Sequence, residues 1–255
     1  MKIPKIVFRP MSLEKNIDRI KWAFYEDNDS LDVHRYTVEY YPELEEIDTK
    51  TPKEVAYKKI EQVVRNQYNK NYDELEKEVE RYNRIWDEYN EKYFPLLSKY
   101  LNTNWPEDKL VINAEIGFIP VCPRYIDTYS FDLYTDMSDL GLIRVCAHET
   151  LHFLWFKKWM EMYPDTPIDG NEIPDLVWKY SEMITDPVLN NKPFDIFNFK
   201  EEGYDSFYEM YDGDELVMDK LRKLYEKDMT IEEKIDKGFK YIERIENEKN
   251  STKKR

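Results

Sequence analysis

Apolar residues recur at steps of three and four along much of the chain, which is the spacing of one face of an α-helix. This pattern predicts helices over residues 13–25, 175–190, 213–227 and 230–247, with a frayed polar tail at 249–255. A run over 33–41 has an extended pattern and ends before Pro42. We therefore expect a protein that is mostly helical.

Two further helices are predicted in the first half of the chain. Thr51, Pro52 and Glu54 occupy the N-cap, N1 and N3 positions of a capping box, so a helix is expected to begin there. A second helix is expected over residues 75–96, where Pro95 should kink or end it. Their apolar positions are Tyr57, Ile60, Val64 and Tyr68 in the first helix, and Leu75, Val79, Tyr82, Trp86, Tyr89, Tyr93 and Leu96 in the second. Together the two predict a helical hairpin whose aromatic stripe packs onto the rest of the protein.

The period changes to two over residues 110–118, which predicts a half-buried strand. A second short strand is expected over 129–134. The fold class expected is α+β, mostly helical, with a small β-sheet packed on a buried helix and on a later helix that carries a glutamate. The organisation expected is an N-terminal region with the hairpin, a central core and a C-terminal helical region, at 1–102, 103–192 and 193–255.

Charge and cysteine content narrow the classes of partner. The chain has 38 Lys and Arg against 53 Asp and Glu, a formal net charge of -15. Such a surface repels phosphate backbones and anionic lipid headgroups, so we expect neither nucleic acid nor a membrane as partner. Two cysteines, Cys122 and Cys146, cannot form a disulfide framework, which agrees with a reducing compartment. The expected location is the cytoplasm.

The candidate chemistry lies in the run LGLIRVCAHETLHFLWF at residues 140–156, which is apolar around nearly the whole helical circumference. In the middle of this buried helix stand His148, Glu149 and His152. Two imidazoles and a carboxylate are costly there unless something satisfies them, and a metal ion would do so. Residues four apart share a helix face, so both histidines can bind one tetrahedral zinc at about 2.0–2.1 Å. We interpret the remaining histidine, His34, as an ordinary residue.

A catalytic zinc usually has three protein ligands and an open position. No histidine follows His152, so the third ligand is expected to be a carboxylate. In the run WKYSEMITDPVL, Glu182 and Asp186 stand four apart, so if Glu182 binds the metal, Asp186 can accept the other ring N–H of His148. The other carboxylates that could serve are Glu172, Asp175, Glu201 and Glu202.

The motif HETLH followed by SEMITD resembles the gluzincin family of metallopeptidases, typified by the thermolysin-like enzymes, over roughly residues 111–190. The resemblance implies Zn²⁺ as cofactor, with Glu182 as the third ligand and Asp186 orienting a ligand. It implies hydrolysis of peptide bonds by zinc-activated water, with Glu149 as general base and then general acid. In such enzymes a strand on the cleft rim binds the substrate in extended form, a role that falls to 129–134. The expected partner is a peptide or an unfolded polypeptide.

The tetrahedral oxyanion formed in such a reaction needs a second donor besides zinc. Thermolysin-like enzymes use a downstream histidine, which this chain lacks. A tyrosine hydroxyl serves in some other gluzincins, and the candidates here are Tyr204, Tyr208 and Tyr211.

Two alternatives remain open. One is a latent or inactive protein with a zincin fold, in which the helical additions cover the cleft and the site has a binding or regulatory role. The other is a deformylase-like hydrolase with Cys122 as a metal ligand. The Pro-flanked segment around Cys122 lacks that family's glutamine and glycine motifs, which disfavours the second alternative.

Overall fold

The computed structural model describes residues 2–25, 33–47, 50–166, 168 and 173–253. Its elements are, in chain order, β1 (Lys5–Pro10), α1 (Leu13–Tyr25), α2 (Val33–Tyr40), η1 (Pro42–Leu44), α3 (Lys53–Leu101), β2 (Val111–Gly117), β3 (Arg124–Tyr125), β4 (Ser130–Tyr134), α4 (Asp139–Met162), α5 (Asp175–Met183), α6 (Thr185–Leu189), η2 (Lys192–Phe197), α7 (Asp205–Tyr208), β5 (Tyr211–Asp212), β6 (Glu215–Leu216), α8 (Val217–Tyr225) and α9 (Ile231–Lys253). The predicted α+β, mostly helical class is therefore confirmed. Within these residues, no helix has both the length and the apolar composition that crossing a membrane requires.

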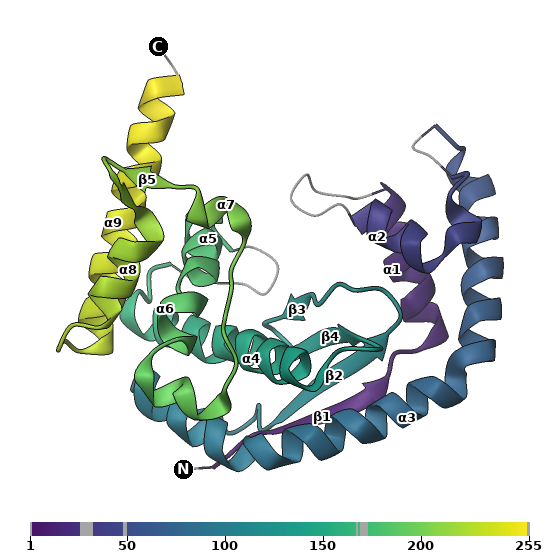
Figure 1. Ribbon diagram of the computed structural model, residues 1–255, viewed down its shortest axis with the longest axis horizontal. Coiled ribbons are helices and arrows are strands. Elements are labelled where there is room, and N and C mark those ends of the chain that lie inside the picture. The colour runs from purple at the N-terminus through teal and green to yellow at the C-terminus, as the bar shows by residue number, and fades with distance from the viewer. Residues whose placement is uncertain (1, 26–32, 48–49, 167, 169–172, 254–255) are drawn as a thin grey trace.

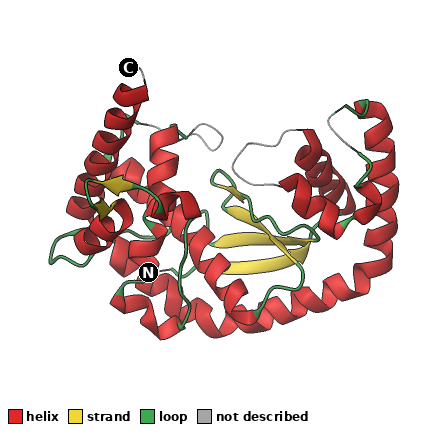
Figure 2. Ribbon diagram, turned by 45° about the horizontal axis from the view of Figure 1, so that its top comes forward, coloured by secondary structure: helices red, strands yellow, loops and turns green. Residues whose placement is uncertain are grey.

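A four-stranded sheet with the order β1-β2-β4-β3 lies at the centre of the molecule (Figures 1 and 2). β1, β2 and β4 are parallel, and β3 pairs antiparallel to β4 at the edge. Ile112, Ala114 and Ile116 of β2 are buried, as the period of two predicts. The sequence pattern does not predict β1, although Ile6 and Phe8 alternate inward, because a six-residue strand carries little periodicity of its own.

The predicted hairpin is wrong, because α3 is one continuous helix of 49 residues. It begins beside α1, descends, and then follows the underside of the sheet (Figure 1). Residues 69–74, between the two predicted helices, contain neither glycine nor proline, so nothing in the backbone forces a turn there. Pro95 lies inside the helix, near its end, where the missing N–H removes one helical hydrogen bond. The helix ends at Asn102, which is left-handed with φ of 49°.

Residues 33–41, predicted to be extended, form the helix α2 instead. The run is rich in β-branched and aromatic residues, which favour strands in isolation. Val33 and Thr37 stand four apart and are both buried, and the Thr37 hydroxyl donates to the Val33 carbonyl at 2.7 Å. Burial of one helical face outweighs the local preference.

The helix predicted over 175–190 is divided into α5 and α6 at Ile184. Pro187 has no N–H to continue the α5 ladder, which accounts for the break. The predicted helix over 213–227 is wrong in its first turn, because a two-stranded hairpin, β5 and β6, precedes α8. Gly213, with φ of +66°, makes the turn of that hairpin. α9 continues to Lys253, so most of the predicted frayed tail is helical.

The C-terminal helices pack on the core of the protein. The Tyr180 hydroxyl on α5 lies 3.0 Å from the Tyr225 hydroxyl on α8 and donates to the Ile235 carbonyl on α9 at 3.2 Å. At Gly238 the backbone of α9 approaches so closely that an added Cβ would lie 2.2 Å from the Tyr180 hydroxyl. α8 and α9 are therefore part of the packed body that surrounds α4 and α5.

Candidate metal centre

α4 is buried because other elements cover it along its length. Its N-terminus is capped by Ser138, whose hydroxyl accepts from the Gly141 N–H at 3.1 Å. The ring of Phe153 stacks on Tyr129, next to β4, with centroids 5.0 Å apart. Further contacts are made by Tyr93 of α3, whose hydroxyl donates to the Ala147 carbonyl at 2.6 Å, by Tyr180 of α5 against Trp155 and by Phe239 of α9 against Trp159. The expectation of a buried helix is confirmed.

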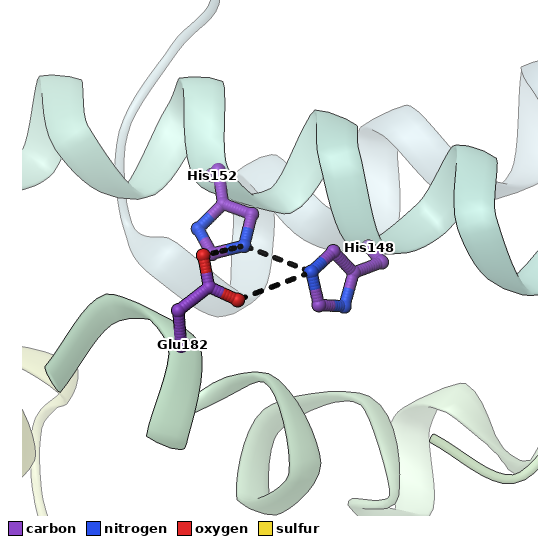
Figure 3. Close-up of side chains that lie close together, drawn as sticks. All are labelled: His148, His152 and Glu182. Atoms are coloured by element: carbon purple, nitrogen blue, oxygen red, sulfur yellow. Dashed lines mark hydrogen bonds and ion pairs between the residues drawn. The ribbon is translucent and has the colours of Figure 1, made fainter. Parts of the chain in front are cut away.

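His148 and His152 of α4 and Glu182 of α5 point toward one another (Figure 3). The two histidine Nε2 atoms are 3.1 Å apart. Glu182 faces both rings, with Oε2 3.5 Å from His148 Nε2 and Oε1 3.6 Å from His152 Nε2. The structure therefore brings together the three residues expected to hold the metal.

These separations fit a tetrahedral ion. Ligand atoms bound at the usual 2.0–2.1 Å in tetrahedral geometry lie roughly 3.3 Å from one another. The two Nε2 atoms, 3.1 Å apart, are close to that spacing, and each has a different Glu182 oxygen near it, at 3.5 and 3.6 Å. One nitrogen or oxygen from each of the three residues lies within 4.8 Å of the others.

Glu201, which follows η2, holds the outer nitrogen of His148. Its Oε1 is 2.7 Å from His148 Nδ1, an arrangement in which Nδ1–H donates to the carboxylate and Nε2 faces His152 and Glu182. Asn190 fixes the Glu201 backbone, since its amide donates to the Glu201 carbonyl at 2.9 Å and accepts from the Glu201 N–H at 2.8 Å. Glu201 was expected only as an alternative metal ligand, and in the structure it contacts His148, one of the residues expected to hold the metal.

The expected role of Asp186 is therefore wrong. Asp186 is buried, but its carboxylate accepts from Tyr208 at 2.8 Å, from Asn190 at 2.8 Å and from Arg222 Nη2 at 2.6 Å. The division of 175–190 into two helices means that a spacing of four no longer places Asp186 on the Glu182 face. Its contact with Asn190 connects it to Glu201 instead.

Arg124 of β3 is a site residue that the sequence analysis missed. Its Nη2 lies 2.6 Å from Glu182 Oε1, and its Nη1 lies 3.8 Å from Glu149 Oε2. Three nearly buried carboxyl groups thus lie around the two histidines, with Glu149 and Glu182 against Arg124 and Glu201 against His148. Metal binding requires neutral histidines, and with all three carboxyl groups ionised the charge of Arg124 then leaves an excess of two negative charges, which a divalent metal ion would offset.

Several buried polar atoms around this point have no hydrogen-bond partner among the described residues. They are Glu149 Oε2, Glu201 Oε2, His152 Nδ1 and Arg124 Nε. Unpaired buried polar groups are costly, and a group of them around one point is typical of a site that takes a ligand. Together with the ligand spacing, these atoms fit a bound cation.

Burial and neighbouring charges shift the pKa values of His148 and His152 in opposite directions, and those of Glu149 and Glu182 in opposite directions. Burial lowers the pKa of His148, but Glu201 and Glu182 more than offset it, so this pKa is raised well above its ordinary value. Burial and the charge of Arg124 lower the pKa of His152 to about 3, so that ring is neutral. Burial raises the pKa of Glu149 to about 7. The pKa of Glu182 is held well below its ordinary value because Arg124 and the histidines outweigh burial.

The three candidate tyrosines lie in different surroundings. Tyr204 is close enough to Glu182, Arg124 and Glu149 for their charges to act on its pKa, which burial raises to about 12. The Tyr208 hydroxyl lies between Asp186 and the Gly203 N–H, and Tyr211 on β5 is 60% exposed. Of the three, Tyr204 is the one that the structure places beside the candidate metal centre.

The remaining predicted residues lie elsewhere or serve other contacts. Asp175 and Glu202 are exposed, and Glu172 lies outside the described residues. His34 packs edge-on against Phe24 with ring centroids 4.6 Å apart, as an ordinary residue does. Cys122 lies outside the group of atoms that could share one metal ion.

A strand that binds substrate on the rim of the cleft has to be an edge strand of the sheet. The strand over 129–134 is not an edge strand. β3 covers part of its outer side, where Arg124 pairs with Phe131 and Tyr125 with Ser130. The edge strand nearest the candidate metal centre is therefore β3. A two-residue strand beside two prolines has too little pattern to be predicted from sequence.

Comparison with known proteins gave no match to a family model, to a curated protein or to a solved structure.

Proposed function

We propose that the protein is a zinc-dependent metallopeptidase that hydrolyses peptide bonds. The observation that carries the proposal is the convergence of His148, His152 and Glu182, whose ligand atoms lie within 4.8 Å of one another, with the two Nε2 atoms 3.1 Å apart. The excess of buried carboxyl groups around them supports a divalent ion at the same point. When bound, zinc would supply an acidic water and polarise a carbonyl group.

Separate residues of the chain hold the ion, orient a ligand and transfer the proton. His148, His152 and Glu182 hold the ion, and Glu201 keeps the Nε2 lone pair of His148 directed at it. Glu149 is placed beside this group and accepts the proton of the attacking water, then returns it to the leaving amine. A pKa of about 7 suits a group that must both take and give a proton near neutrality.

An extended polypeptide is the substrate class that the surroundings favour. β3 is the edge strand of the sheet and carries Arg124 into the site, so the edge and the reactive groups are adjacent. An extended peptide can add to a sheet edge through main-chain hydrogen bonds. A peptide or an unfolded polypeptide is therefore the proposed partner, and the cytoplasm remains the proposed location.

The direct test is metal analysis followed by hydrolysis. Protein purified without added zinc should contain about one zinc per chain, and replacing His148 or His152 by alanine should abolish this content. Zinc-loaded protein should hydrolyse a denatured polypeptide, whereas Glu149→Gln should keep its zinc and lose the activity. Absence of zinc, with none taken up on titration, would refute the proposal.

A latent or regulatory zincin-like protein is the second candidate, and the low exposure of the site favours it. The side chain of His148 is 18% exposed, and those of Glu149 and Glu182 are 7% and 3% exposed. Removing the C-terminal helices is not a clean test of latency, because Tyr180 and other buried residues pack against them. A zinc-loaded, folded wild type that leaves every member of a denatured-polypeptide library intact would favour this candidate over the peptidase.

A further inference from the structure

Arg124 enters the candidate metal centre from the edge strand β3. Its guanidinium lies 2.6 Å from the expected ligand Glu182 and 3.8 Å from the expected base Glu149. The side chain is 12% exposed, and its Nε has no hydrogen-bond partner among the residues that the structure describes. A cation with unused donor capacity is thus positioned beside the two groups that would flank the reacting carbonyl.

The surroundings of β3 hold this guanidinium in place. The neighbouring Tyr125 donates its hydroxyl to Asp132 Oδ2 at 3.1 Å. Lys15 and Arg19 of α1 bind the same carboxylate at 2.6 and 2.9 Å, and each lies 5.1 Å from the Tyr125 ring centroid. A strand of two residues is therefore fixed by a partly buried ionic cluster around Asp132, and its donors need little reorganisation to act.

We propose that Arg124 is a catalytic residue, the donor that stabilises the tetrahedral oxyanion. The inference rests on the proposed peptidase function. When the water oxygen bonds to the carbonyl carbon, the C=O π electrons move to the carbonyl oxygen and the water proton passes to Glu149. Negative charge therefore leaves Glu149 and appears on the substrate oxygen.

This transfer of charge makes the contact between Arg124 and the substrate oxygen stronger in the transition state than in the bound substrate. Protonated Glu149 is a weaker partner for the guanidinium, whose Nη1 then pairs with the new oxyanion while Nη2 stays with Glu182. Interactions that strengthen only in the transition state accelerate the reaction. No histidine follows His152 to stabilise the oxyanion, and Arg124 would supply the donor instead.

Arg124 fits this role better than Tyr204. Charge-assisted hydrogen bonds are roughly twice as strong as neutral ones, and Tyr204 offers a neutral hydroxyl. The Tyr204 ring packs against Trp178 and Phe207, with centroids 6.0 and 5.4 Å away. Arg124, in contrast, forms ion pairs with both Glu149 and Glu182.

The first test uses anion binding, which does not require turnover. Protein loaded with Co²⁺ in place of zinc is titrated with inorganic phosphate, a tetrahedral anion, and separately with imidazole, a neutral metal ligand, and the visible spectrum is followed. Arg124→Gln should weaken phosphate binding at least about tenfold and leave imidazole binding and metal content unchanged. Arg124→Lys should restore part of the phosphate affinity because it keeps the charge.

Two control variants test whether phosphate binding depends on direct contact with Arg124 or on any nearby positive charge or donor. Arg144→Gln removes a half-buried cation from α4, one turn before His148, and should leave phosphate binding unchanged. Tyr204→Phe should also leave it unchanged. Equal losses in Arg144→Gln and Arg124→Gln, or a loss in Tyr204→Phe alone, would overturn the inference.

Hydrolysis of a denatured polypeptide then separates transition-state from ground-state binding. Arg124→Gln should lower kcat by about 10²–10³-fold with KM nearly unchanged, as removal of one oxyanion donor does. A raised KM with kcat retained would assign Arg124 to a substrate carboxylate and overturn the inference. A wild type that takes up no metal would refute the proposed function, whereas metal uptake with phosphate binding indifferent to Arg124 would refute this inference alone.

Discussion

Replacing Glu201 tests which carboxylate orients His148. The sequence analysis expected Asp186 in this role, and the structure places Glu201 there. Glu201 is 1% exposed, and its carboxylate holds His148 Nδ1 at 2.7 Å. Glu201→Ala removes this acceptor, so the His148 ring is no longer fixed and a buried N–H is left unpaired. Glu201→Gln keeps an acceptor of the same shape but removes the negative charge.

The expected loss of zinc affinity is about 10–100-fold, which is typical when the partner of a metal-bound histidine is removed. Glu201→Ala should lie near the upper end of this range and Glu201→Gln near the lower end. The loss corresponds to roughly 1.4–2.7 kcal/mol of binding free energy. At saturating zinc the ligand-induced rise in Tm should therefore shrink by about 3–10 °C in a chain of this length.

Affinity is measured by competition with a chromophoric chelator, and Tm by thermal unfolding with and without zinc. Glu202→Gln is the matched control, because Glu202 is the next residue and is exposed to solvent. It should bind zinc as the wild type does. If Glu201→Ala kept wild-type affinity while Asp186→Ala lost 10–100-fold, the orienting role would return to Asp186 and the reasoning from the Glu201 contact would be refuted.

Two further predictions concern the packing that supports the site. Tyr93→Phe removes a buried hydrogen bond to the Ala147 carbonyl and should lower the free energy of unfolding by about 0.5–1.5 kcal/mol in urea, with zinc content unchanged. A loss of zinc without a loss of stability would contradict the supporting role. Gly238→Ala should destabilise by about 1–3 kcal/mol, because the new methyl group meets the buried Tyr180 hydroxyl, whereas Lys237→Ala on the exposed face of α9 should have little effect. Equal urea midpoints for the two alanine variants would show that α9 does not pack as described.

Local pattern in the sequence predicted the parts of the protein that depend on near neighbours. The period of two identified β2, and the apolar run around HETLH identified α4 as a buried helix. Because residues four apart share one helix face, the sequence also predicted that His148 and His152 lie close together. The same rule failed for Glu182 and Asp186, since a break at Ile184 separates their helices.

Only the tertiary structure decided which residues complete the site. Arg124 reaches Glu182 across 58 residues of sequence, and Glu201 reaches His148 across 53. Neither residue lies in a periodic segment, since one belongs to a two-residue strand and the other follows η2. Periodicity reports the face on which a side chain lies relative to its neighbours in the same element. The partner of a buried charge is set instead by where distant segments fold back, and that depends on packing and on charge pairing across the whole chain.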